Sequence, residues 1–258
     1  RRKPSPNDVS PILDVIGDKH VRYLFIIGGN DSAETGDIIA SAACENGREL
    51  TVINIPKTID NDLVLTDHSP GYGSAAKFVA FATMGIGIDS ESMGKESPIA
   101  VLEVMGRDAG WLAAASVLAK REERDAPHVI CIPEVPLEEG RFLDCIGYAY
   151  QNYGFAVAVV AENVRGVRGV LGADKDPWYV DDFGHRYFEG AGRYLAGLIG
   201  KYFNVRTRYE KPGTIQRSMS PLVSRVDVRE AEMVGRAAVR YALDGESNQM
   251  VTLLRSGG

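Results

Sequence analysis

The stretch YLFIIGGNDS, residues 23–32, contains the pattern that decides the fold class. Its first five residues, Tyr23 to Ile27, form an apolar run typical of a strand buried in a parallel sheet. Two glycines follow, and residues 34–46 then have the pattern of a helix that ends at Gly47. A strand, a glycine turn and a helix in this order are the repeating unit of an α/β protein.

The same alternation continues along the chain. We expect further strands at residues 50–55, 99–104, 129–132, 155–161 and 250–254, and helices at residues 75–86, 109–121, 142–151, 192–203 and 228–243. The longest apolar run, residues 155–161, is far shorter than the roughly 20 residues of a membrane helix, so we expect no membrane partner. The polar stretch 172–184 is predicted to connect two blocks of structure.

The composition excludes several classes of protein. The chain has 45% hydrophobic and 25% charged residues, as ordinary globular proteins do, and its net charge of −6 provides no basic surface for nucleic acid. Its cysteines, Cys44, Cys131 and Cys145, lack the spacing of a zinc site or a disulfide framework, so we expect reduced thiols and a cytoplasmic location. Because the chain begins with RRKP, we expect it to start partway into a longer protein.

Ligands of parallel α/β sheets bind at the carboxyl ends of strands, and the residues there are unusual in this chain. The segment GGNDS, residues 28–32, directly follows the first strand. Glycines permit close approach of the backbone to a ligand, and the following helix N-terminus offers N–H groups to a phosphate. The alternative is a plain turn in which Ser32 or Asp31 caps the helix.

Two more polar segments follow strands. PKTIDND, residues 56–62, places two carboxylates beside a lysine and a threonine, and phosphoryl transfer needs a carboxylate to accept a proton and oxygen ligands for Mg²⁺. The alternative is a solvated turn rich in Asx residues. MGRDAGW, residues 105–111, holds Arg107 in a glycine-flanked turn from which its permanent charge can reach an oxyanion. The alternative is a surface arginine near a helix start.

Two nucleotide-binding patterns are excluded or weak. The chain has no P-loop, because Gly94-Lys95-Glu96 lacks the hydroxyl residue and the spacing. Residues 71–76, GYGSAA, fit the dinucleotide fingerprint, but the polar segment 66–70 precedes them instead of a strand, so we reject that interpretation.

Together, the three polar segments resemble those of the phosphofructokinase family. The resemblance continues in the same order through IPEVP at residues 132–136, VAEN at 160–163 and TIQR at 214–217. It implies two Rossmann-like α/β lobes with parallel-rich sheets, an active site in the cleft between them, and an N-terminal part of the fold that this chain lacks. The implied boundaries are 1–71 plus 216–258 for the phosphoryl-donor lobe and 72–215 for the sugar-phosphate lobe. A homo-oligomer, dimeric or tetrameric, is also implied.

The resemblance assigns roles to individual residues. Asp60 resembles the general base that deprotonates the 1-hydroxyl of fructose 6-phosphate, Thr58 would bind the sugar or the transferring phosphate, and Arg107 would offset the charge of that phosphate. The remaining assignments are Met105, Gly106 and Glu162 to the sugar, Arg208 and Arg217 to the 6-phosphate, Gly29, Asn30, Asp31 and Lys57 to the donor, and Asn30, Asp31 and Asp62 to Mg²⁺. Paired cations of this kind suit a dianion.

The resemblance favours pyrophosphate as the donor. Members that use ATP typically read GGDG and PGTIDND, whereas this chain has Asp31 and Lys57 at two of those glycines. An aspartate at the place of the α-phosphate of ATP repels it and fills its space, and Lys57 can neutralise that aspartate. The predicted activity is reversible phosphorylation of fructose 6-phosphate to fructose 1,6-bisphosphate. Alternatives are an ATP-dependent enzyme, a silent regulatory subunit and, as the weakest, a nicotinamide oxidoreductase.

Four departures from the family pattern stand beside the resemblance. Asn30 replaces an aspartate near Mg²⁺, Thr214 replaces a histidine near the sugar phosphate, and Pro98 stands where many tetrameric members have an arginine that reaches the neighbouring subunit. The opening strand and phosphate loop of the family are absent, although Arg1 or Arg2 resembles the arginine that closes the next loop. Related acceptors, such as sedoheptulose 7-phosphate, stay open.

Overall fold

The chain folds into two compact α/β units. The computed structural model describes residues 6–167, 169–172, 179–180, 186–187 and 190–256. The first unit comprises Arg1–Tyr72 and Ser224–Gly258, and the second comprises Gly73–Val223. These units divide after Tyr72 and Val223, whereas the expected lobes divide after residues 71 and 215. Within the second unit, the Gln216 side chain accepts a hydrogen bond from the Met105 amide.

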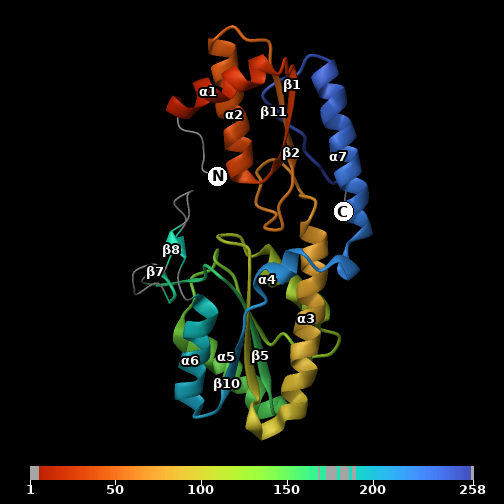
Figure 1. The fold of residues 1–258 in the computed structure, drawn as a ribbon. Helices are drawn as coiled ribbons and strands as arrows, with labels where there is room; N and C mark the ends of the chain where they lie inside the picture. Colours follow the sequence, from red (N-terminus) through yellow and green to blue (C-terminus); the bar gives the residue numbers. More distant parts are fainter. Residues whose placement is uncertain (1–5, 168, 173–178, 181–185, 188–189, 257–258) are drawn as a thin grey trace. The chain divides into compact units, whose positions relative to one another are not determined.

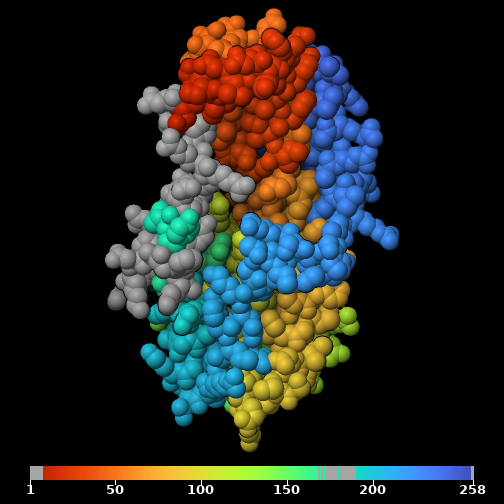
Figure 2. Space-filling view, in the orientation of Figure 1, coloured from red at the N-terminus to blue at the C-terminus, as the bar shows by residue number. Residues whose placement is uncertain are grey.

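The first unit is a parallel sheet between helices (Figure 1). Its strands have the order β1-β2-β11, with bounds Tyr23–Gly28, Thr51–Pro56 and Gln249–Met250. Helices α1 (Pro6–Asp18) and α2 (Asn30–Glu45) cover one face, and α7 (Arg225–Leu243) covers the other. Figure 2 shows α1 in red and α7 in blue as surfaces of this unit. Two segments distant in sequence therefore build one layered structure.

Alternation along β2 divides the core of this unit between the two faces. Val52 packs with Ile39 and Leu13 on the side of α1 and α2. The next residue, Ile53, packs with Val234 and neighbouring residues of α7. Successive strand side chains point to opposite faces, so a fully apolar strand must be covered on both sides. Each fully buried aliphatic side chain contributes about 1.5–3 kcal/mol.

The second unit has a four-stranded parallel sheet in the order β10-β3-β5-β4. Its two central strands, β3 (Ile99–Val104) and β5 (Ala156–Ala161), are buried at every residue. The other regular elements are β10 (Thr207–Glu210), β4 (Val129–Cys131), α3 (Tyr72–Met93), α4 (Trp111–Ala115), α5 (Glu139–Tyr153) and α6 (Ala191–Phe203). Short 3-10 turns are η1 (Gly94–Glu96), η2 (Ser116–Ala119), η3 (Gly213–Arg217) and η4 (Ser220–Leu222). Antiparallel pairs join β6 (Arg165–Gly166) to β7 (Gly169–Val170) and β8 (Tyr179–Val180) to β9 (Arg186–Tyr187).

The α/β class with parallel sheets is confirmed, and the differences from expectation are local. β1 is an edge strand of the sheet among the described strands, and Ile27 is 64% exposed rather than buried. α2 begins at Asn30 with Gly29 as its N-cap, so neither Ser32 nor Asp31 caps it. The expected helix 109–121 is the shorter pair α4 and η2, and the expected strand 250–254 is reduced to β11. Most of the predicted connection 172–184 lies outside the described residues.

The helix α1 and the strand β10 were not predicted from the sequence, nor were the short strands β6 to β9. Pro11 inside α1 weakened the helical pattern, and the charged residues of β10 concealed a strand. In the part of the chain that the structure describes, no helix has the length and apolar character to cross a membrane.

Candidate active site

The segments GGNDS and PKTIDND lie side by side at the carboxyl edge of the first sheet. Gly28 and Pro56 are register partners at the ends of β1 and β2, and the Lys57 amide donates to the Gly28 carbonyl at 3.0 Å. Beyond the strands, the Asn30 side-chain amide donates to the Asp62 carboxylate at 2.7 Å. Parallel pairing thus brings the expected donor residues together with Thr58 and Asp60 within the first unit, whereas Arg107 belongs to the second.

The turn into α2 requires glycine and creates a site suited to an anion. A Cβ atom at Gly28 would lie 2.0 Å from the Ser32 hydroxyl, so a side chain cannot be placed there without a shift. Gly29 is the N-cap in an extended conformation, and the helix has no side-chain cap. The first backbone N–H groups of a helix of this length, with the positive end of its dipole, favour bound phosphate.

The loop after β2 holds Asp60 half-buried beside Thr58. The Asp60 amide donates to the Thr58 hydroxyl oxygen at 3.1 Å, and Thr58 forms an isolated bridge with Gly71. Asn61 has a φ of 52°, and its side-chain oxygen accepts from the Ser69 amide at 2.8 Å. These contacts fix the direction in which the loop presents the two carboxylates.

The expected Mg²⁺ ligands fit a cation only in part. Asp62 offers a carboxylate oxygen, whereas Asn30 turns its amide nitrogen toward Asp62 and offers its oxygen only after the amide rotates by half a turn. Among the described residues, no group of three or more His, Cys, Asp or Glu side chains could hold a metal ion. Mg²⁺ commonly takes one or two carboxylates together with water and substrate phosphates, and that is the arrangement these residues suit.

In the second unit, the expected sugar-binding residues gather at the carboxyl ends of β3 and β5. The Arg107 amide donates to the Glu162 carboxylate at 3.0 Å. The Glu162 amide in turn donates to the Val104 carbonyl at 3.0 Å. The Met105 amide donates to the Gln216 side-chain oxygen at 3.1 Å, which brings the neighbouring Arg217 to this loop. Gln216, which is only 2% exposed, is an anchor that the sequence analysis did not identify.

The Met105–Gly106–Arg107 turn has a constrained backbone. Gly106 has a φ of 134°, and a Cβ atom there would lie 2.5 Å from the Ala109 carbonyl oxygen. Arg107 itself has a φ of 50°, a left-handed conformation that costs a non-glycine residue about 1–2 kcal/mol. Residues held in such conformations are concentrated at functional sites, so the observation agrees with a working role for Arg107.

Arg208 does not join this group in the chain described here. It lies in β10 opposite Ala100, near the start of β3, whereas Met105 follows the other end of that strand. Its guanidinium contacts the Asp89 carboxylate and donates to the Ser90 hydroxyl at 2.8 Å. The geometry of one chain therefore gives no support to its expected contact with the 6-phosphate.

A buried carboxylate at the end of β3, just before the Met105–Arg107 turn, was also not predicted from the sequence. Glu103 is 1% exposed within β3, and its carboxylate contacts the Lys211 ammonium at 2.6 Å and accepts from the Gly192 amide at 2.9 Å. Burial, together with the nearby Glu103 carboxylate, raises the pKa of Tyr209 well above its usual range. Glu103 interrupts the apolar run 99–104, and this feature of the sequence could have predicted a buried charge at this place.

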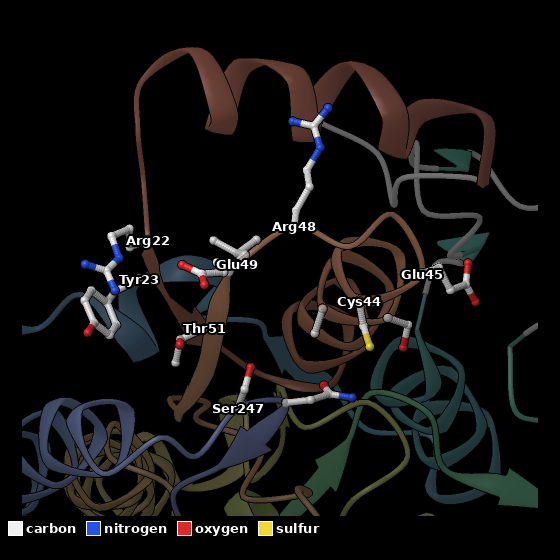
Figure 3. A pocket seen from close by; sticks show the side chains of 12 residues that line it. Arg22, Tyr23, Cys44, Glu45, Arg48, Glu49, Thr51 and Ser247 are labelled. Atoms are coloured by element: carbon white, nitrogen blue, oxygen red, sulfur yellow. The ribbon is translucent and has the colours of Figure 1, made fainter.

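A hollow in the first unit lies away from the candidate site residues (Figure 3). It has a volume of about 790 Å³ and is lined by the beginnings of β1 and β2 and the end of α2, with Arg22, Arg48, Cys44 and Glu49 among its side chains. It is therefore at the amino edge of the sheet, opposite to the edge where parallel α/β proteins bind ligands. None of the predicted site residues lines it.

The order and geometry of these segments agree with a comparison to known families. Residues 1–242 match the family model described as Phosphofructokinase. The chain belongs to the phosphofructokinase family. The dinucleotide interpretation of residues 71–76 has no structural support, because α3 begins at Tyr72 without a strand among the described residues 63–70 before it.

Individual phosphofructokinase relatives cover nearly all of this chain. It is 38% identical over 245 residues to the pyrophosphate--fructose 6-phosphate 1-phosphotransferase of Halomonas elongata, an alignment covering 95% of this chain and 58% of the relative. The crystal structure of the pyrophosphate-dependent phosphofructokinase of Marinobacter aquaeolei matches with a TM-score of 0.83 and 32% identity, over 98% of this chain and 60% of that one. The chain thus spans about three fifths of the length of these relatives.

Relatives with other substrates also match this phosphofructokinase-family chain. The sulfofructose kinase of Alkalicoccus urumqiensis is 32% identical over 96% of this chain and 65% of its own length. The ATP-dependent 6-phosphofructokinase 2 of Streptomyces coelicolor is 30% identical over 93% of this chain and 65% of its own length. Family membership by itself therefore fixes neither the donor nor the acceptor.

Proposed function

We propose that this chain supplies much of a phosphotransferase that moves a phosphoryl group from pyrophosphate to the 1-hydroxyl of fructose 6-phosphate. The products are fructose 1,6-bisphosphate and phosphate. The observation that carries the proposal is the contact between the two polar segments of the first unit, where Asn30 reaches Asp62 and Thr58 holds Asp60. The proposal includes the cytoplasmic location and homo-oligomeric assembly expected from the sequence.

Asp60 is assigned as the general base in this mechanism. It accepts the proton of the 1-hydroxyl as the oxygen attacks the terminal phosphorus of pyrophosphate, and phosphate departs on the opposite side. Thr58 orients the reacting groups, and Arg107 offsets the negative charge of the transferring group. No covalent intermediate on the protein is needed, because alignment and charge stabilisation account for the transfer. Mg²⁺, held by Asp62 and Asn30 or Asp31 with the donor phosphates, would supply further positive charge.

The other site residues divide between the substrates in the same proposal. Gly29, Asn30, Asp31 and Lys57 bind pyrophosphate at the α2 N-terminus. Met105, Gly106 and Glu162 bind the sugar, and Arg217 and Arg208 bind its 6-phosphate. Arg208 is the least supported of these assignments, because its guanidinium is engaged by Asp89 and Ser90.

Pyrophosphate is favoured over ATP by the side chain of Asp31. This carboxylate lies in the first turn of α2, where a donor phosphate would meet the helix N-terminus. Its charge and volume disfavour the additional α-phosphate of ATP. The pyrophosphate-dependent relatives from Halomonas elongata and Marinobacter aquaeolei add weight to this choice.

A donor comparison tests the proposal. The full-length protein is supplied with fructose 6-phosphate, Mg²⁺ and either pyrophosphate or ATP, and fructose 1,6-bisphosphate is quantified. We expect turnover with pyrophosphate alone, and we expect Asp31→Gly combined with Lys57→Gly to lose pyrophosphate activity and gain some with ATP. Turnover of the wild-type protein with ATP alone would reject the donor assignment and leave the kinase assignment standing.

The second candidate is a catalytically silent regulatory subunit. Retention of Asp60, Asp62 and Arg107 argues against it, because a silent copy has no need of a general base. Activity of the purified protein without any partner separates the two functions. Silence with both donors and with 6-phosphate sugars other than fructose 6-phosphate would favour the regulatory role.

A further inference from the structure

A group of charged residues, three of them buried, connects the loop that carries Asp60 to α7 and to the C-terminal segment. We call it the His68 cluster, and its members are His68, Asp227, Glu230 and Arg255. His68 Nδ1 is 2.5 Å from Glu230 Oε2, and His68 Nε2 is 3.4 Å from Asp227 Oδ1. Arg255 donates to both oxygens of Glu230, at 2.5 and 3.1 Å. All four residues belong to the first unit.

Charge balance explains why the cluster is stable in a buried place. His68, Asp227 and Glu230 are 7%, 5% and 3% exposed. A carboxylate oxygen lies at each ring nitrogen of His68, an arrangement that the two N–H groups of an imidazolium satisfy. An imidazolium in this place, with the Arg255 guanidinium, would balance the two carboxylates. Burial opposes ionisation of Glu230, but the hydrogen bonds from Arg255 and His68 prevail and hold its pKa below the usual range.

The cluster fastens the loop of residues 56–72 to two distant parts of the chain. His68 connects the loop to α7, which carries Asp227 and Glu230. The Arg255 amide donates to the Asp67 carboxylate at 2.7 Å, and the Asp67 amide donates to the Leu253 carbonyl at 2.8 Å. Both side chains and backbone groups of the loop therefore contact α7 and the C-terminal segment.

The same histidine is linked to the catalytic end of the loop through one short path. The residue after it, Ser69, donates its amide to the Asn61 side chain at 2.8 Å, and Asn61 lies between Asp60 and Asp62. The rings of His68 and Tyr72 form a T-shaped contact, with 6.0 Å between their centroids. Displacement of His68 would therefore also shift residues 60–62, which carry the Asp60 and Asp62 carboxylates.

We propose that His68 is a positioning residue, which holds the loop of Asp60 in its working geometry through ion pairs with Asp227 and Glu230. The proposal rests on the proposed function for Asp60. Replacing His68 by a neutral side chain removes a contact from each of two buried carboxylates, and loss of a partner of a buried charge is costly enough to move the loop. A misplacement of about 1 Å at a reacting group can cost about 100-fold in rate.

The test compares His68→Gln, which keeps a hydrogen-bonding side chain but loses the charge, with Val234→Ala as a matched control. Val234 is 2% exposed in the same helix as Glu230 and packs on β2, so its truncation destabilises the unit without touching the loop. In the full-length protein we expect His68→Gln to lower kcat about 10- to 100-fold, with KM for both substrates changed less than about threefold. Val234→Ala is expected to leave kcat nearly unchanged.

Amide hydrogen exchange provides a second readout that does not depend on activity. We expect His68→Gln to accelerate exchange at the Asp67 and Ser69 amides about tenfold or more, while the Val251 amide, which donates to the Asn54 carbonyl, changes little. Should His68→Gln fail to fold, Arg255→Gln tests the same cluster more mildly, since the Arg255 side chain is 53% exposed. The expected changes are in the same direction and smaller.

The outcomes separate this proposal from the proposed function. Unchanged exchange in a folded His68→Gln variant would overturn the positioning role, whatever the activity. Faster exchange with a kcat equal to that of Val234→Ala would overturn its connection to catalysis. A wild-type protein that is inactive with fructose 6-phosphate would reject the proposed function, while the exchange data would still decide whether His68 holds the loop.

Discussion

At the scale of single residues, the loop of Asp60 and the Met105–Arg107 turn are each held by residues distant in the sequence. Asp60, Asp62 and Arg107 stand out because each follows a strand in a glycine- or Asx-rich turn. Their supports, Gln216 and the His68 cluster, come from distant parts of the chain. Local periodicity contains no information about such pairings, so only the folded structure reveals them.

Replacement of Asp60 by Asn tests the general base. Removal of a proton acceptor commonly costs about 10²–10⁴-fold in rate, so we expect kcat of Asp60→Asn to fall by that amount while the fold is kept. The measurement is steady-state formation of fructose 1,6-bisphosphate. Asp14→Asn is the matched control, because Asp14 is an exposed partner of Arg48 on α1 and such surface pairs contribute little. A kcat of Asp60→Asn within about threefold of the control would contradict the assignment.

The backbone of Arg107 allows stability and activity to be separated. Because its φ is 50°, Arg107→Gly should be about 1 kcal/mol more stable than Arg107→Ala, the reverse of the usual order for these two residues. Both variants lack the guanidinium, so both should lose a similar, large part of kcat. Urea unfolding and turnover of the two variants provide the measurements. Equal or greater stability of the Ala variant would contradict the strained conformation.

At the scale of elements, strands were predicted more accurately than helix ends. The expected strand 99–104 coincides with β3, because Pro98 before it and the glycine-containing turn 105–107 after it limit the mostly apolar run. Helix α3 extends from Tyr72 to Met93, well beyond the expected 75–86, because its glycines and polar residues hide the pattern. β1 was expected to be buried, but it lies at the edge of the described sheet. Its edge position depends on which other strands pair with it, and the residues of β1 alone do not determine that pairing.

The residue directly before β4 is a histidine, His128, that should stay neutral in acid. His128 Nδ1 accepts from the Val157 amide at 3.0 Å, and Nε2 lies 3.0 Å from the Arg124 carbonyl, which suits the neutral ring with its hydrogen on Nε2. Burial, against these backbone hydrogen bonds, lowers the pKa of His128 from 6.5 to about 4. In the unfolded chain the ring binds its proton near pH 6.5, so this residue should reduce stability as the pH falls from about 6.5 to about 4.

Ring titration by NMR measures this effect directly. We expect the His128 resonances to titrate with a midpoint near 4, and we expect His128→Gln to weaken the loss of stability between pH 6.5 and pH 4 in urea unfolding. The exposed ring of His20 provides an internal reference in the same spectra. A midpoint for His128 near 6.5 would contradict the burial argument.

At the scale of the whole molecule, the two units differ in how their cores are assembled. The first unit needs the returning C-terminal segment, because Ile53 and Ile55 pack against Val234 and Val251. The second unit is continuous from Gly73 to Val223. The expected division after Ile215 and the observed division after Val223 differ by the segment that contains Gln216, whose side chain accepts from the Met105 amide of the second unit.

Fragments test this difference in assembly. We expect residues 73–223 to unfold cooperatively on their own, because their sheet is formed entirely within the fragment. Residues 1–72 alone should lack cooperative unfolding, since one face of β2 would lose the helix that covers it. Addition of the 224–258 segment should restore it. Thermal unfolding followed by near-ultraviolet circular dichroism provides the measurement, and cooperative unfolding of residues 1–72 alone would contradict the account.

The most direct test of the central claim is a competition between the two donors in one reaction. The full-length protein receives fructose 6-phosphate, Mg²⁺, ³²P-labelled pyrophosphate and an equal concentration of unlabelled ATP, and the label in fructose 1,6-bisphosphate is compared with the total product. We expect nearly every product molecule to carry the label, because the proposed roles have Asp31 disfavour ATP and Asp60 activate the acceptor. Abundant product without label would contradict it.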